Sequence, residues 1–256
     1  MTETSFHSLP DGRRIAHRFT DGQGPVLVFL PGYMSDMSGS KAQALFDHAV
    51  QTGRPCLLLD YSGCGESSGA FAEGTLSRWK DEVISLVKAL CPGRPLILAG
   101  SSMGGWLMLL VAHALPQQAR ALLGVAPAPD FTEWGLDEAQ RALLATGEVL
   151  YEDNPYGPEP TPTYPAFWRD GQASRLLSRE IPLDCPVRLL HGLEDPDVPW
   201  RISLALAEAL RSADVQVTLV KDGDHRLSRD GDIALLLRTV DELVDELCAA
   251  LAANEG

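Results

Sequence analysis

A serine flanked by two glycines is the feature of this chain that points most directly to chemistry. Residues 100–104 read Gly, Ser, Ser, Met, Gly, which is a G-x-S-x-G pattern with Ser102 at its centre. The apolar run at 95–99 predicts a buried strand before this pattern, and 106–115 predicts a buried helix after it. A serine on such a strand–turn–helix element can attack an acyl carbon when a base takes its proton. The pattern therefore predicts Ser102 as a nucleophile.

Two later segments place an acid and a histidine where a catalytic serine would need them. The strand predicted at 187–190 is followed by Asp195, and the strand predicted at 215–220 is followed by His225. Because the carboxyl ends of parallel strands meet at one edge of a sheet, Ser102, Asp195 and His225 are expected to converge. Serine, acid, histidine is also the chain order of hydrolases whose nucleophile lies on such an elbow.

Neighbouring acids and histidines compete for these two roles. Glu194 and Asp197 flank Asp195, which could instead cap the helix expected to begin near residue 199. His191 follows its strand directly, which favours a buried structural role for it. The other histidines lie near the amino terminus or in predicted helices and are weaker candidates: His7, His17, His48 and His113.

A developing oxyanion needs two N–H donors in this arrangement. The residue after the nucleophile, Met103, supplies the first. Tyr33 follows the apolar strand predicted at 26–30 and the pair Pro31, Gly32, so its backbone N–H is expected to supply the second. A plain Pro-Gly turn between strand and helix is the alternative interpretation of that loop.

Composition favours an enzyme of one globular domain covering residues 1–256. The net charge of −14 argues against a nucleic-acid partner, because phosphate binding needs clustered Lys and Arg. Five cysteines without C-x-x-C spacing suggest neither a disulfide framework nor a zinc site, and we expect no metal and no cofactor. The sequence leaves the oligomeric state open.

The first fourteen residues are polar and lack the apolar core of a signal peptide, and the run at 106–115 is too short to span a bilayer. We therefore expect no stable membrane insertion. Free thiols fit a reducing compartment, so a cytoplasmic location is predicted.

Apolar runs of strand length alternate with amphipathic helices along the chain. This order predicts an α/β-hydrolase fold, in which a mostly parallel central sheet carries helices on both faces and a small cap insertion. An antiparallel strand at 13–19 is expected to precede the strand at 26–30. The other predicted elements are helices at 41–52 and 75–90 and strands at 55–59 and 121–125.

The alternation breaks between residues 127 and 185, where a helix around 137–146 is followed by proline-rich sequence. An irregular segment between two core strands predicts a cap over the active site. Its aromatic side chains would suit an apolar acyl chain, although they could equally pack the cap onto the core: Trp134, Tyr151, Tyr156, Tyr164, Phe167 and Trp168.

The glycine-containing segment at 60–67 follows a strand but lacks the second half of a G-x-G-x-x-G spacing. It predicts a tight structural loop, not a dinucleotide site. Cys64 within it has no basic neighbour in sequence that would activate its thiol.

Several of these stretches resemble the abhydrolase-domain group of serine hydrolases, and in particular its palmitoyl-protein thioesterases, which also act as acyl-glucuronide esterases. The specific strings are G-S-S-x-G-G-W-L-M from residue 100 and L-L-H-G-x-x-D-x-x-V-P-W from residue 189. The resemblance implies cleavage of protein S-acyl thioesters and activated oxygen esters, with Ser102, Asp195 and His225 as the triad. Shorter matches lie at 31–33, 39, 41–42, 60–63, 75–76, 79 and 224–226.

Two departures limit what the resemblance implies. The chain begins without an Arg-rich, acid-poor targeting segment, so mitochondrial import is not implied. Residues 130–179, which should select the substrate, show no comparable run of matches.

The expected function is hydrolysis of a small-molecule acyl ester or an S-acylated protein through an acyl-enzyme. A C–C bond hydrolase or a perhydrolase could use the same triad, and a ligand-binding receptor could use the same fold. Haloalkane and epoxide hydrolysis are disfavoured because those enzymes use a carboxylate nucleophile where this chain has serine.

Overall fold

A mostly parallel sheet of eight strands forms the centre of the computed structural model, which describes residues 3–155 and 157–254. The strand order is β1-β2-β4-β3-β5-β6-β9-β10. β2 pairs antiparallel with β1 and β4, and the remaining neighbours are parallel. The strands are β1 (Ser5–Ser8), β2 (Arg14–Thr20), β3 (Val26–Leu30), β4 (Cys56–Leu59), β5 (Leu96–Ser101), β6 (Ala119–Val125), β9 (Val187–Gly192) and β10 (Val215–Val220).

The central strands form because their residues are apolar on both faces, as a sheet covered on both sides requires. Every residue of β3, β4, β5 and β9 is buried. These strands and the antiparallel β2 confirm the succession of strands predicted along the chain. The edge strand β1 was not predicted, because its four residues are mostly exposed and carry no alternating apolar pattern.

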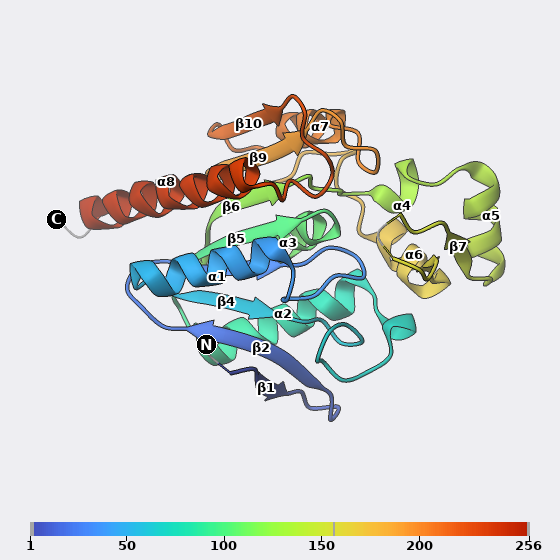
Figure 1. The fold of residues 1–256 in the computed structure, drawn as a ribbon, viewed down its shortest axis with the longest axis horizontal. Helices are drawn as coiled ribbons and strands as arrows, with labels where there is room; N and C mark the ends of the chain where they lie inside the picture. The colour runs from blue at the N-terminus through green and yellow to red at the C-terminus, as the bar shows by residue number, and fades with distance from the viewer. Residues whose placement is uncertain (1–2, 156, 255–256) are drawn as a thin grey trace.

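Helices cover the two faces of the sheet (Figure 1). Side chains of α1 and α8 belong to one apolar cluster, and those of α2, α3 and α7 belong to the other. The helices on the two faces are α1 (Ser40–Thr52), α2 (Leu76–Leu90), α3 (Met103–Ala114), α7 (Arg201–Ala209) and α8 (Asp230–Asn254). A short 3₁₀ turn, η1 (Phe71–Glu73), precedes α2. Helices on both faces of a parallel sheet are what the sequence predicted.

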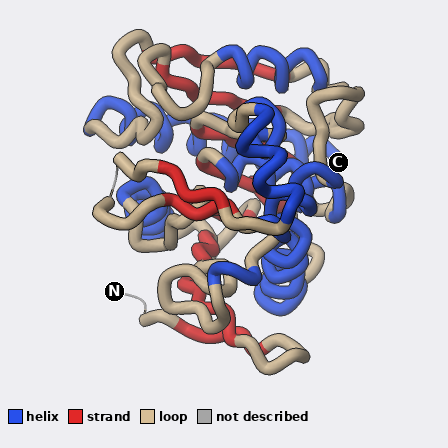
Figure 2. The backbone as a smooth tube through the Cα atoms, turned by 90° about the vertical axis from the view of Figure 1, so that its right-hand side faces the viewer, coloured by secondary structure: helices blue, strands red, loops and turns tan. Residues whose placement is uncertain are grey.

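The segment 127–185, called the insertion from here on, lies between β6 and β9. It extends beyond the carboxyl ends of the parallel strands β4 and β5 (Figure 1), and Figure 2 looks onto this side. The sequence predicted α5 but not the short hairpin of β7 and β8, nor α6. The elements of the insertion are α4 (Phe131–Trp134), α5 (Glu138–Thr146), β7 (Leu150–Glu152), β8 (Thr161–Thr163) and α6 (Pro165–Ala173).

Polar side chains attach α6 to the core. The Asp170 carboxylate accepts hydrogen bonds from the backbone N–H of Ser77 at 2.8 Å and from its hydroxyl at 2.7 Å, at the start of α2. Trp106 of α3 donates its indole N–H to the carbonyl of Ser174, just after α6, at 3.2 Å. The α6 side of the insertion is therefore tied to both helices that lie beneath it.

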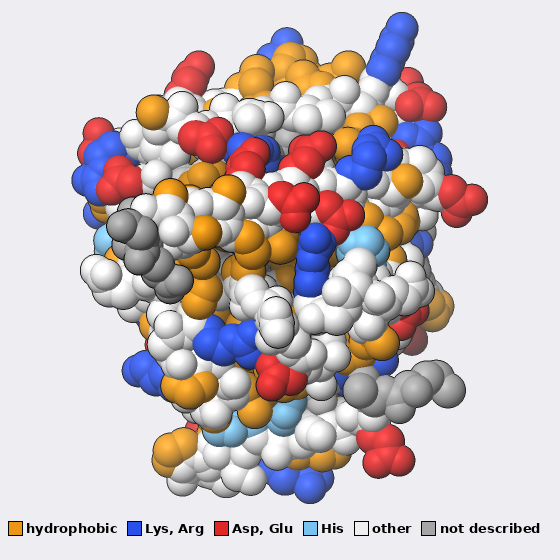
Figure 3. Space-filling model, turned by 90° about the vertical axis from the view of Figure 1, so that its left-hand side faces the viewer, with side chains coloured by type: hydrophobic (Ala, Val, Ile, Leu, Met, Phe, Trp, Pro, Cys, Tyr) orange, Lys and Arg blue, Asp and Glu red, His pale blue; other side chains and the backbone are white. Residues whose placement is uncertain are grey.

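The face opposite the insertion carries charges of both signs. Figure 3 shows Asp and Glu side chains interspersed there with Lys and Arg, without a continuous basic band on the part of this face that is described. Among residues 3–155 and 157–254, no helix combines the length and the apolar character needed to cross a membrane.

Candidate active site

Ser102 lies on the turn between β5 and α3 with φ +54° and ψ −120°. This conformation is strained for a residue with a side chain, so surrounding contacts must hold it. The Ser102 N–H donates to the carbonyl of Val125 at 3.0 Å, and the Ser102 carbonyl accepts from the N–H of Ala128 at 3.0 Å. Both partners belong to β6 or the residues after it, so the neighbouring strand holds the turn in place.

Glycine at position 104 is what allows this turn to approach the sheet. A Cβ atom at Gly104 would lie 2.0 Å from the carbonyl oxygen of Leu30, and one at Gly100 would lie 2.2 Å from the carbonyl oxygen of Gly104. Both distances are far below van der Waals contact. The two glycines of the G-x-S-x-G pattern are thus required by packing against the end of β3 and within the turn itself.

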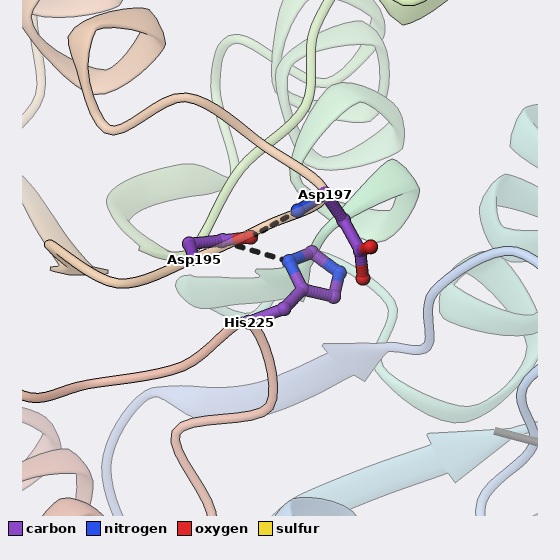
Figure 4. Close-up of side chains that lie close together, drawn as sticks. All are labelled: Asp195, Asp197 and His225. Atoms are coloured by element: carbon purple, nitrogen blue, oxygen red, sulfur yellow. Dashed lines mark hydrogen bonds and ion pairs between the residues drawn. The ribbon is translucent and has the colours of Figure 1, made fainter. Parts of the chain in front are cut away.

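Asp195 and His225 form a hydrogen-bonded pair at the same edge of the sheet. Asp195 lies in the loop after β9, and His225 lies in the loop after β10. Nδ1 of His225 is 2.9 Å from Oδ2 of Asp195 (Figure 4). The Asp195 side chain is fully buried, whereas 15% of the His225 side chain is exposed. The acid is therefore behind the imidazole, and the imidazole has access to the surface of the site.

The surroundings of Asp195 favour its ionised form. Burial alone would raise its pKa, but hydrogen bonds from His191 and His225 and from the N–H of Val198 outweigh burial and hold the pKa well below its ordinary value. Oδ1 accepts from the N–H groups of Asp197 at 2.9 Å and Val198 at 2.8 Å. The carboxylate is consequently charged at neutral pH and fixed in orientation.

His191 has the buried structural role that the sequence favoured, with one contact that the sequence did not reveal. Its side chain is fully buried, and its Nε2 lies 2.9 Å from the carbonyl of Val198. A carbonyl only accepts, so Nε2 carries a proton and Nδ1 accepts from the hydroxyl of Ser203, 2.7 Å away, in the neutral ring. The same Nε2 is 3.2 Å from Oδ2 of Asp195, which makes His191 a second imidazole on that oxygen.

The competing acids occupy different positions. Glu194 and Asp197 are both exposed, and Asp195 is the carboxylate hydrogen-bonded to His225.

Ligand atoms of Asp195, Asp197 and His225 lie within 4.8 Å of one another, a spacing that a metal ion could span (Figure 4). Both Asp195 oxygens already face N–H donors, however, so this carboxylate is poorly prepared to bind a cation. The absence of a metal remains a prediction.

A cavity of about 570 Å³ lies between the sheet edge and the insertion. Ser102, His225, Tyr33 and Met103 all line it. Met103 is the first residue of α3, so its N–H has no acceptor within the helix. The loop carrying Tyr33 runs beside the serine, because a Cβ atom at Gly32 would lie 3.4 Å from Cβ of Ser102. Four of the residues predicted to act together thus share one cavity.

The aromatic residues of the insertion mostly pack against the protein. Of the six that were predicted, Trp134 lines the cavity, Tyr151 is 61% exposed, and Tyr156 lies outside the described residues. Phe167 is buried in the core cluster, Tyr164 packs against the same cluster, and Trp168 packs against a small cluster around α5. Of the two interpretations, packing onto the protein holds for Phe167, Tyr164 and Trp168, and among the described rings only Trp134 is placed to meet an acyl chain.

Sequence reasoning also missed residues that line the cavity. Phe131 of α4 and Lys41 of α1 both do so. Lys41 donates a hydrogen bond from Nζ to the carbonyl of Arg226, next to His225. Burial lowers the pKa of Lys41 to about 8. Lys41 lies in one of the short stretches that match the abhydrolase-domain group, but that match gave it no role. Phe131 lies beside the aromatic residues that composition did identify.

The segment at 60–67 is the structural loop that the sequence predicted. The buried Asp60 carboxylate accepts from the N–H groups of Met37 at 2.7 Å and Glu66 at 2.8 Å, and so joins two loops at the sheet edge. Burial raises the pKa of Asp60 and raises that of the Cys64 thiol to about 12. Cys64 is therefore a thiol, not a reactive thiolate, near neutral pH.

Comparison with known proteins identifies the family. The alpha/beta hydrolase family model matches residues 27–246. This chain belongs to the alpha/beta hydrolase family. The hydrolase is 39% identical over 255 residues to the human protein named palmitoyl-protein thioesterase ABHD10, mitochondrial, covering 96% of this chain and 81% of the human one. The resemblance and fold class predicted from the sequence are thereby confirmed.

Two solved structures are similar over nearly their whole length. Alpha/beta hydrolase domain-containing protein 10 from mouse superposes with a TM-score of 0.88 at 38% identity, covering 96% of this hydrolase and 99% of the mouse chain. A putative hydrolase from Agrobacterium vitis S4 gives 0.87 at 38% identity, covering 95% and 98%.

The cytoplasmic location predicted from composition is wrong, because the human, mouse and orangutan (Pongo abelii) relatives are all named mitochondrial. The prediction rested on free thiols and on a polar amino-terminal segment. Free thiols fit any reducing compartment, so they do not distinguish one from another.

Proposed function

We propose that this hydrolase cleaves acyl thioesters and esters through an acyl-enzyme on Ser102. The observation that carries the proposal is the hydrogen bond between Asp195 and His225 at the wall of the cavity that Ser102 also lines. A buried, ionised carboxylate on Nδ1 leaves Nε2 of the imidazole as the basic atom. The strained turn at Ser102 supports the same role, because backbone strain of this kind concentrates at functional sites.

In the proposed first step, His225 takes the proton of the Ser102 hydroxyl as its oxygen attacks the acyl carbon. Asp195 orients the imidazole and stabilises its charged form. The N–H groups of Tyr33 and Met103 stabilise the oxyanion of the tetrahedral intermediate. His225 then gives its proton to the departing thiol or alcohol, and water repeats the sequence on the acyl-enzyme.

The insertion is proposed to act as a cap over the cavity, to which it contributes both apolar residues and the polar residues at 152–154. Phe131, Trp134 and Leu136 line it from the insertion and offer apolar surface for the acyl chain. Lys41 and Arg226 line it close to His225, which must reach the leaving atom. We therefore assign the apolar side to the acyl group and the charged side to the leaving group.

The names of the relatives favour an S-acylated protein or a small acyl ester as the substrate. Relatives that align with 96% of this chain are named palmitoyl-protein thioesterases. Thioester and ester hydrolysis use the same acyl-enzyme chemistry, so the catalytic residues alone do not separate them.

The decisive experiment combines covalent labelling with a substrate panel. A fluorophosphonate probe should label the protein once, and mass spectrometry should locate the label on Ser102. An S-acyl peptide thioester and a p-nitrophenyl ester should be hydrolysed, whereas a vinylogous diketone and peroxide-dependent acyl transfer report the C–C hydrolase and perhydrolase alternatives. Absence of labelling together with tight binding of an unaltered small molecule would instead favour a receptor.

A further inference from the structure

Tyr33 is attached to the protein at two places that serve different purposes. Its backbone lies in the loop after β3, beside Ser102, where its N–H is proposed to stabilise the oxyanion. Its side chain reaches away from the sheet, and its hydroxyl donates a hydrogen bond to the carbonyl of Pro162 at 2.7 Å. Pro162 is a buried residue of β8, in the hairpin of the insertion. One residue therefore connects the proposed oxyanion donor directly to the insertion.

The Tyr33 ring is held between the core and the insertion. Phe71 and Trp79 contact it from the core with ring centroids at 5.0 Å and 6.3 Å. Phe167 and Phe131 contact it from the insertion at 4.8 Å and 6.2 Å. Burial raises the pKa of the phenol above its ordinary value, so the hydroxyl is protonated at neutral pH and remains a donor.

The rest of this loop is held from below by the core. The hydroxyl of Tyr61 donates to the carbonyl of Pro31 at 3.1 Å, and Gly104 packs directly under the carbonyls of Leu30 and Pro31. These contacts fix the beginning of the loop, and the N–H of Met37 bound to Asp60 fixes its later part. The Tyr33 hydroxyl holds the residue between them, and it does so through the insertion instead of the sheet.

We propose that the Tyr33 hydroxyl is a positioning group that holds the Tyr33 N–H in place for the oxyanion by binding the Pro162 carbonyl. This inference rests on the proposed function. An oxyanion donor acts only at hydrogen-bond distance from the developing charge, and a displacement of about 1 Å costs up to roughly a hundredfold in rate. The position of the hairpin consequently sets the geometry of the reacting centre.

Tyr33→Phe is the direct test, since it removes one oxygen and leaves both the ring contacts and the backbone N–H. We expect kcat for an acyl p-nitrophenyl ester to fall about tenfold or more, with KM within about twofold. Binding of a boronic acid, whose adduct with serine resembles the tetrahedral intermediate, should weaken by the same factor as kcat/KM. Loss of packing alone would not produce this parallel change.

Tyr164→Phe is the matched control, because Tyr164 is a tyrosine of the same region whose ring also contacts Phe71 but which does not line the cavity. Its kinetics should stay near those of the wild type. If Tyr33→Phe does not fold, Pro162→Gly loosens the acceptor while leaving Tyr33 intact, and kcat should then fall with little change in KM.

If the wild type is active and Tyr33→Phe has the same kcat, this inference is overturned and the proposed function is not. A loss confined to KM, unchanged boronic acid binding, or an equal loss in Tyr164→Phe would overturn it too. Where Pro162→Gly replaces it, unchanged kcat has the same meaning. A wild type that is neither labelled nor active would overturn the proposed function and this inference together.

Discussion

His191 Nε2 lies 3.2 Å from Oδ2 of Asp195, the same oxygen that receives His225. The second imidazole is fully buried and does not line the cavity, so it acts on the site through the carboxylate. Together the two rings counter the effect of burial on the pKa of Asp195.

Replacing His191 should change the ionisation of Asp195 while leaving Ser102, Asp195 and His225 in place. In His191→Phe, the pKa of Asp195 should rise because one hydrogen-bond donor is lost and burial remains. We expect kcat to fall about tenfold, and stability to decrease because Ser203 and Val198 lose a buried partner. The ¹³C chemical shift of the Asp195 carboxyl, followed against pH, measures the change. His48→Phe, at a partly exposed imidazole paired with Asp241, is the control; an unshifted Asp195 titration would refute the prediction.

Ser102→Ala should abolish turnover while leaving the fold intact. Removing the proposed nucleophile is expected to lower kcat/KM for a short p-nitrophenyl ester by about 10³-fold or more. Circular dichroism and thermal unfolding verify the fold, and fluorophosphonate labelling should disappear. Ser101→Ala, at the adjacent serine, should still be labelled. Full turnover in a purified Ser102→Ala preparation would exclude this residue as the nucleophile.

Asp195→Asn should distinguish Asp195 from its acidic neighbours. The amide keeps the shape of the side chain but cannot stabilise the imidazolium, and it permits the wrong tautomer of His225, so kcat should fall about 10³–10⁴-fold. Glu194→Gln changes an exposed neighbour outside the cavity and should leave kcat within about twofold. Comparable losses in both variants would mean that the acid has been misassigned.

The partly buried ammonium of Lys41 predicts a specific pH dependence of stability. Burial lowers its pKa from 10.5 to about 8 in the folded protein, so between these values the unfolded chain binds more protons than the folded one. The free energy of unfolding therefore rises from pH 8 to pH 10.5, and the destabilisation caused by burying the charged ammonium is largest below pH 8. The gain in urea midpoint of Lys41→Met over wild type should be largest near pH 7 and should shrink towards pH 10.

The control for that series is Lys88→Met, at an exposed lysine of α2. It reports the effect of the substitution itself at each pH. A constant difference between Lys41→Met and wild type from pH 7 to pH 10 would show that Lys41 does not have a lowered pKa.

Trp134 is the aromatic residue of the insertion with which acyl chain selection can be tested. Trp134→Ala should raise KM for a long-chain acyl thioester by about tenfold, because apolar contact with the chain is lost, and should affect an acetyl ester much less. Tyr151→Ala removes a mostly exposed ring of the same insertion and serves as the control. Equal changes in KM for long and short acyl groups would argue against an acyl site beside Trp134.

The sequence predicts the core well where a simple physical pattern determines the element. β3 and β10 have the predicted bounds, because β3 is an uninterrupted apolar run and β10 is apolar or β-branched at every position except Gln216. The parallel topology puts the loops that carry Ser102, Asp195 and His225 at one edge of the sheet, as the sequence predicted.

The insertion could not be predicted to the same degree. β8 contains Pro162, although proline within a run normally argues against a strand, and α6 begins with Pro165, a favoured first helical position that a proline-rich segment does not distinguish from a loop. The contact between His191 and Asp195 depends on how the loop after β9 closes. No spacing rule specifies that closure, and the same is true of the contact between Tyr33 and Pro162.

The positive φ of Ser102 has a consequence for how such a protein evolves. Glycine would occupy this conformation without steric cost, so a chain with glycine at position 102 is expected to be more stable and yet inactive. On the proposed mechanism, turnover requires a strained serine at this position instead of glycine. In a related protein that does not need turnover, glycine at position 102 is expected to increase stability. Gly104 is expected to remain there, because its packing against the end of β3 leaves no room for a Cβ atom.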